Sequence, residues 1–171
     1  MAGTAVLAAA LAASVGGAGC GTLGGRRTRL PELMLERLDG GTWDLRDEAG
    51  RVVVLQFFAT FDGSSLALAS TLERIHVRFQ PSGVSVVGVA MDPGEGHARR
   101  RVVDAFCSLA NQSFEVVLAS DELGRGETAL GRIPTIPATV VFDRRGDPVA
   151  SVTGVFREAE LTALLEDLAG D

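Results

Sequence analysis

The sequence has no lysine, no tyrosine and only two cysteines among its 171 residues. Its sixteen basic residues are therefore all arginine, and the formal net charge is −6. No stretch concentrates enough of them to form a nucleic-acid surface, so we predict no nucleic-acid partner. The densest basic cluster, Arg99-Arg100-Arg101, stands at the start of an expected helix, where three charges are typical of a solvated face. Two cysteines are also too few for a disulfide-rich scaffold.

The first nineteen residues carry no charge. Their apolar run, AVLAAALAASV, has the length of a signal peptide and is too short for a confident transmembrane span. Small residues then lead to Cys20, which is typical of a lipoprotein processing site; the alternative is a simple secretory signal with Cys20 there by chance. We expect a signal peptide over residues 1–19, a linker over 20–29 and a folded domain over 30–171. Export would place the protein on the periplasmic or cell-envelope side, held to the membrane by a lipid on Cys20.

Lipidation or removal of Cys20 would leave Cys107 as the single thiol of the folded domain. No intramolecular disulfide is then possible, even in an oxidising compartment. Stability must come from the core alone. A chain of this length with 46% hydrophobic residues can bury such a core in one domain.

Turn chemistry and apolar runs predict the strands. Apolar and polar residues alternate on both sides of Asp39-Gly40-Gly41, which predicts a β-hairpin over residues 30–45. Two nearly continuous apolar runs predict centre strands covered on both faces. A short strand and a C-terminal hairpin turning at Arg144–Asp147 complete the set. The predicted centre strands span residues 51–60 and 83–92, the short strand 114–120, and the C-terminal hairpin 136–155.

Helical spacing of apolar residues predicts helices between and after the strands. The predicted helices span residues 64–79, 96–109, 126–133 and 158–170. Their expected inner faces are Leu68, Leu72, Ile75 and Phe79 on the first, Val102, Val103 and Phe106 on the second, and Leu161, Leu164, Leu165 and Leu168 on the last. Asp92, Asp121 and Asp143 each follow a predicted strand, where carboxylates commonly cap turns or helices. This order predicts an α/β fold with a central mixed sheet flanked by helices.

The order of elements and three local sequences resemble the thioredoxin-like superfamily, in the TlpA-like and AhpC/TSA redoxin branch of exported thiol–disulfide oxidoreductases. The resemblance covers residues 30–169. Residues 32–61 resemble the entry hairpin and first central strand of that branch, residues 83–92 its next strand, and residues 133–154 its cis-proline loop and final hairpin.

The resemblance fails where the family carries its chemistry. The family reads Trp-Cys-Gly-Pro-Cys, and this chain reads Phe61-Asp62-Gly63-Ser64-Ser65. Thiol–disulfide exchange needs an attacking thiolate and a second sulfur, which a carboxylate and a hydroxyl cannot replace. The helix N-terminus that stabilises a thiolate also favours a capping carboxylate at Asp62, and Ser64 is a second competent cap. We therefore predict a folded chain that lacks dithiol chemistry, and leave open whether it is an enzyme.

Two further positions match the family. Pro137 matches its cis-proline, and the resemblance implies that the residue before it, Ile136, pairs its backbone with an extended substrate peptide. With Phe61 beside them, these residues predict an apolar peptide-docking groove; the alternative is a proline that only shapes the turn. Gln56 stands six residues before Asp62, where thioredoxins place a buried aspartate that handles the proton of the resolving thiol.

Two functional hypotheses follow, and a purely structural role or a pseudogene-like remnant is the remaining alternative. In the first, a monomer without cofactor or metal binds an extended polypeptide or a redox partner protein at the groove. In the second, the protein is an active monothiol oxidoreductase or antioxidant protein that uses Cys107. A cysteine within a helix is more often buried and inert, and a reactive one needs exposure and a cationic neighbour.

Overall fold

The computed structural model describes residues 29–170, which form one seven-stranded mixed sheet in the order β2-β1-β5-β4-β3-β6-β7. Its centre is parallel: β3 pairs with β4 and β4 with β5, while the outer pairs are antiparallel. The strands are β1 (Met34–Arg37), β2 (Thr42–Asp44), β3 (Val52–Phe58), β4 (Val84–Ala90), β5 (Glu115–Leu118), β6 (Ala138–Phe142) and β7 (Pro148–Thr153). The signal peptide, Cys20 and nearly all of the predicted linker lie outside the described residues.

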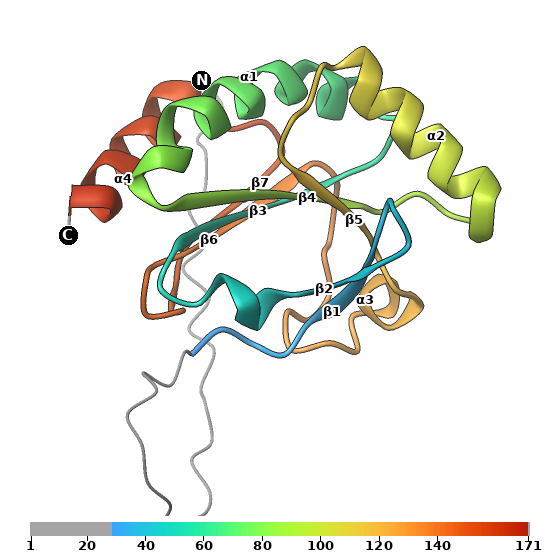
Figure 1. The fold of residues 1–171 in the computed structure, drawn as a ribbon, viewed down its shortest axis with the longest axis horizontal. Helices are drawn as coiled ribbons and strands as arrows, with labels where there is room; N and C mark the ends of the chain where they lie inside the picture. Colours follow the sequence, from blue (N-terminus) through green and yellow to red (C-terminus); the bar gives the residue numbers. More distant parts are fainter. Residues whose placement is uncertain (1–28, 171) are drawn as a thin grey trace, which may run out of the picture.

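Helices cover both faces of the sheet, with α1, α2 and α4 on one face and α3 on the other (Figure 1). The α-helices are α1 (Gly63–Phe79), α2 (Gly96–Leu109), α3 (Asp121–Arg125) and α4 (Glu158–Gly170); η1 (Leu45–Glu48) and η2 (Gln80–Ser82) are 3-10 turns. Among residues 29–170, no helix is both long and apolar enough to cross a bilayer.

The strongest sequence patterns are confirmed. All seven residues of β3 are buried, as expected for a centre strand with a core on each face. The predicted stripe of α1 is buried against the sheet. The N-terminal hairpin turns at Gly40, whose φ of 91° lies in the left-handed region that favours glycine.

Val102 departs from the prediction for α2. Val103 and Phe106 are buried as expected, but Val102 is 54% exposed. Cys107 and Ala110 also pack against the core, so the inner face of α2 is centred near Val103, and Val102 lies about 100° around the helix from it. The prediction that Val102 faces inward is wrong.

The third helix was predicted in the wrong place. It spans Asp121–Arg125, where the Ser120 hydroxyl caps it by accepting the Leu123 N–H. Gly126 ends it with a φ of 76°, and an added Cβ at Gly126 would lie 2.8 Å from the Arg132 backbone. Residues 126–133 therefore form turns, because the predicted helix would have had to begin on the glycine that terminates the real one.

The prediction that Arg99, Arg100 and Arg101 form a solvated face is wrong for the first two. The Arg99 guanidinium donates to the carbonyls of Ala90 and Ala119, at 2.9 and 3.0 Å, where β4 and β5 end. Arg100 pairs with Glu36 of β1. Only Arg101 of the three arginines is exposed, because neighbouring strand ends supply the other two with partners.

Candidate functional site

The loop between β3 and α1 carries the positions that we predict to correspond to the family dithiol. Asp62 is the N-cap of α1, in extended backbone geometry, and its Oδ2 accepts the Ser65 N–H at 2.6 Å. The Asp62 N–H in turn donates to the Ala59 carbonyl at 3.1 Å. Of the two caps that the sequence allowed, Asp62 is the one used, and Ser64 lies exposed in the first helical turn.

Ser65 lies beneath this cap. It is buried, and its hydroxyl oxygen accepts the Ala59 N–H at 3.4 Å. Of the two positions predicted to correspond to the family cysteines, the inner one therefore holds a small buried hydroxyl and the outer one the capping carboxylate of Asp62. Both side chains are bound to the local backbone, which explains why the helix start is intact without sulfur.

Gln56 occupies the centre of the sheet below the loop. It is 2% exposed, accepts a hydrogen bond from the Thr139 hydroxyl at 2.6 Å and donates to the Phe57 carbonyl. A neutral amide and a neutral hydroxyl thus bridge β3 and β6. Neither Gln56 nor Thr139 is a carboxylate, so neither could accept the proton of a thiol placed at position 65.

A second loop reaches the same edge of the sheet. The Ile136–Pro137 bond is cis, as the resemblance implied, and the Pro137 carbonyl accepts the Gly154 N–H at 2.7 Å. Ile136 is half-buried, and within the described residues its backbone N–H and carbonyl have no hydrogen-bond partner. The two loops share this edge because β3 and β6 are paired, with Phe57 opposite Ala138.

Three apolar side chains stand at this edge, and we call them the edge patch: Phe61, Ile136 and Val155. Phe61 is 74% exposed, and Val155, which follows Gly154, is also exposed. Strand pairing places the loops of Phe61, Ile136, Pro137 and Val155 at the same end of the sheet. The position of Val155 depends on the pairing of β6 with β7, the C-terminal hairpin that the sequence predicted. That these side chains form a peptide-docking groove stays a prediction.

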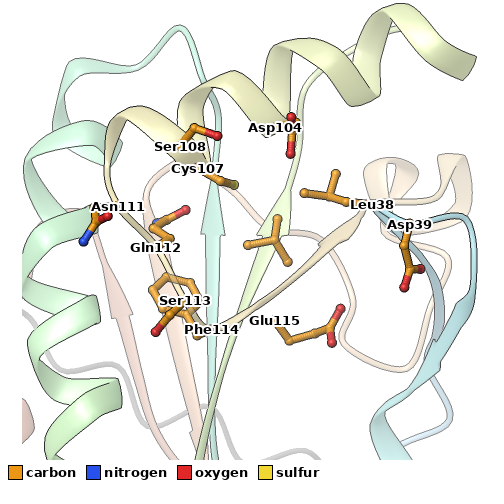
Figure 2. Close-up of a pocket in the computed structure, with 11 residues that line it drawn as sticks. Leu38, Asp39, Asp104, Cys107, Ser108, Asn111, Gln112, Ser113, Phe114 and Glu115 are labelled. Atoms are coloured by element: carbon orange, nitrogen blue, oxygen red, sulfur yellow. The ribbon is translucent and has the colours of Figure 1, made fainter.

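Cys107 lies in a different place. It projects from α2 into an open pocket of about 420 Å³, lined by the end of α2, the α2–β5 loop, the start of β5 and the turn between β1 and β2 (Figure 2). None of Phe61–Ser65 or Ile136–Pro137 lines this pocket. Burial raises the pKa of the Cys107 thiol to about 11, and the negative charge of Asp104 contributes. At pH 7 only about one thiol in ten thousand is then ionised.

No group of three or more His, Cys, Asp or Glu side chains in residues 29–170 is arranged to hold a metal ion. Two of the predicted capping carboxylates hold chain segments by hydrogen bonds. Asp92 binds Thr60 near the site, across two strand ends, whereas Asp143 holds the β6–β7 turn, at the other end of β6, by accepting the N–H groups of Arg145 and Asp147. The sequence indicated that both carboxylates cap turns, but it did not identify their partners.

Cys107 gives a prediction about alkaline stability. Because the sequence has no lysine or tyrosine, Cys107 is the one side chain of residues 29–170 whose usual pKa lies between those of histidine and arginine. A pKa raised by folding means that stability is complete below pH 9 and falls as the pH rises toward 11. Solvent screening reduces the loss to about 1 kcal/mol. Urea unfolding at pH 8 and pH 11 should show this loss in the wild type and not in Cys107→Ser; equal losses would contradict the assignment.

Comparison with known proteins assigns the chain to a family. Residues 27–148 match the model of the AhpC/TSA family, and the chain belongs to that family. A curated relative, the thiol-disulfide oxidoreductase ResA of Oceanobacillus iheyensis, is 28% identical over 134 residues, which cover 78% of this chain and 66% of ResA. The chain therefore matches just under two thirds of that relative's length.

Solved structures confirm the fold. A thiol:disulfide interchange protein of the thioredoxin family from Chlorobium tepidum superposes with a TM-score of 0.70 at 20% identity, over 86% of this chain and 100% of that one. A secreted thiol-disulfide isomerase from Corynebacterium glutamicum gives 0.72 at 19% identity, over 83% and 86%. The predicted thioredoxin-like fold is thereby confirmed.

Proposed function

We propose that this protein is an exported member of the thiol–disulfide oxidoreductase family that lacks dithiol chemistry. It acts by binding an extended polypeptide, free or as a segment of a redox partner protein, at the edge patch. The observation that carries the proposal is the hydrogen bond from the Ser65 N–H to the Asp62 carboxylate, at 2.6 Å. At the two positions that match the family dithiol, the groups present maintain a helix cap.

Without the two sulfurs thiol–disulfide exchange cannot occur, while the loop and the helix start around these positions are intact. A carboxylate cannot attack a disulfide sulfur, and a buried hydroxyl cannot resolve a mixed disulfide. The raised pKa of Cys107 and its separate pocket do not favour the monothiol hypothesis.

The edge patch has the features that recognise an extended chain. The unpaired backbone N–H and carbonyl of Ile136 can extend the sheet by main-chain hydrogen bonds to a bound strand. Phe61 and Val155 offer apolar surface for its alternate side chains. Main-chain pairing would supply affinity and the apolar contacts specificity.

Export is the remaining part of the proposal. The relative from Corynebacterium glutamicum is described as secreted, and the uncharged apolar run before Cys20 has the length of a signal peptide. Attachment through a lipid on Cys20 remains a prediction. Mass analysis of the protein recovered from membranes would test it.

The test combines an activity assay with a binding assay. We expect the protein to add nothing to insulin reduction by dithiothreitol alone. We also expect it to bind the S-carbamidomethylated insulin B chain, an extended probe without reactive sulfur. Phe61→Ser should weaken this binding at least about tenfold, since it removes a large apolar contact. Val149→Ser is the matched control, because Val149 is also exposed but lies at the opposite end of β7.

The outcomes separate the hypotheses. Insulin reduction above the dithiothreitol control that disappears in Cys107→Ser would support the monothiol enzyme instead. Absence of probe binding, or equal binding by Phe61→Ser and Val149→Ser, would contradict binding at the edge patch.

A further inference from the structure

Asp92 joins the end of β4 to the loop that carries Phe61. Asp92 is 7% exposed and accepts hydrogen bonds from Thr60, 32 positions earlier in the chain. The Thr60 N–H donates to both carboxylate oxygens, at 3.1 and 3.2 Å, and the Thr60 hydroxyl donates to Oδ1. Hydrogen bonds to a carboxylate are stronger than those to a neutral acceptor. Asp92 therefore holds Thr60, the residue immediately before Phe61.

A cation offsets the buried carboxylate. Arg99 lies near enough for the charge of Asp92 to raise its pKa, although burial lowers that pKa by more. The Arg99 guanidinium also binds the carbonyls of Ala90 and Ala119 at the ends of β4 and β5. Asp92 and Arg99 together thus tie the carboxyl ends of the three parallel strands.

Phe61 is held from both sides by this arrangement. Thr60 before it is bound to Asp92, and Asp62 after it caps α1 and donates its N–H to Ala59. The Phe61 side chain is 74% exposed, and the residues on both sides of it are held by hydrogen bonds. The fold therefore fixes the short backbone segment that carries this exposed side chain. Ordering it before binding reduces the entropy lost when a partner is bound.

We infer that Asp92 is a positioning residue for the edge patch: through Thr60 it sets the place of Phe61, without contacting the bound segment. Asp92 can position Phe61 in this way without any dithiol chemistry. The affinity readout rests on the proposed binding function, whereas the local geometry can be measured without any ligand.

The experiment compares Asp92→Ala with Asp143→Ala in the full chain. Asp143 is the matched control, since it also follows a strand and holds a turn by accepting backbone N–H groups, but at the β6–β7 turn. The local readout is hydrogen exchange at the Asp62 amide, which Asp92 does not contact, measured relative to the core amide of Leu55. The binding readout is the affinity for the S-carbamidomethylated insulin B chain.

We expect Asp92→Ala to speed exchange at the Asp62 amide at least about tenfold and to weaken probe binding by a similar factor. Asp143→Ala should change neither readout. Asp92→Asn, which keeps an acceptor oxygen for Thr60, should restore most of the protection. Thr60→Val, which removes only the hydroxyl, should give a smaller effect in the same direction and remains informative if Asp92→Ala does not fold.

The two ideas fail separately. If Asp92→Ala and Thr60→Val leave exchange at the Asp62 amide unchanged relative to Leu55, or if Asp143→Ala changes it equally, the positioning role is wrong. If the wild type does not bind the probe while exchange responds as expected, the positioning role holds and the proposed binding of an extended chain is wrong.

Discussion

The triple variant Asp62→Cys, Ser64→Pro, Ser65→Cys is expected to reduce insulin in dithiothreitol at least about tenfold faster than the protein-free control, to which the wild type is expected to add nothing. The expectation follows because β3, the loop after it and the start of α1 are all intact. Ser65 is buried at the inner position, and Asp62 stands at the helix start, where the N–H of residue 65, which now binds the carboxylate, would stabilise a thiolate.

The middle substitution is compatible with the helix. Ser64 lies in the first turn of α1, and its N–H makes no hydrogen bond among the described residues. Proline is tolerated there because its missing N–H would have no intrahelical partner.

Two controls define the result for the dithiol variant. Ser64→Pro alone should add nothing, and Cys107→Ser in the triple background should leave the new activity unchanged. If oxidation fails to join the two introduced thiols in a disulfide, the assignment of positions 62 and 65 to the family dithiol is wrong.

The second large effect is expected for Asp62→Cys alone. Its thiol should react with iodoacetamide at pH 7 at least about a hundredfold faster than Cys107 in the same molecule. A thiol at a helix N-terminus has a pKa below its usual 8.5, whereas burial raises the pKa of Cys107 to about 11. More than two pKa units between them give more than a hundredfold difference in thiolate.

Peptide mapping of the alkylated protein distinguishes the two sites and separates both from Cys20. Ser70→Cys is the matched control, because Ser70 is exposed in the middle of α1, away from the helix N-terminus. Its thiol should react at a rate between the other two. Equal rates for Asp62→Cys and Ser70→Cys would show that the helix N-terminus no longer activates a thiol.

The sequence by itself determined the features that depend on local pattern. The turn at Asp39–Gly41 follows from glycine's access to positive φ, and the buried β3 and the α1 stripe follow from the spacing of apolar residues. The placement of Asp62 at a helix start is equally local, since it needs only a strand, a short loop and a capping side chain.

Only the tertiary structure decided what depends on partners distant in the chain. It joined Thr60 to Asp92, 32 positions later in the chain, by pairing β3 with β4. The sequence predicts that Arg99 is a solvated charge, whereas in the fold the ends of β4 and β5 bring two carbonyls to it. Periodicity and turn chemistry report how a residue relates to its near neighbours, whereas burial, ion partners and thiol pKa are set by groups that only the folded sheet brings together.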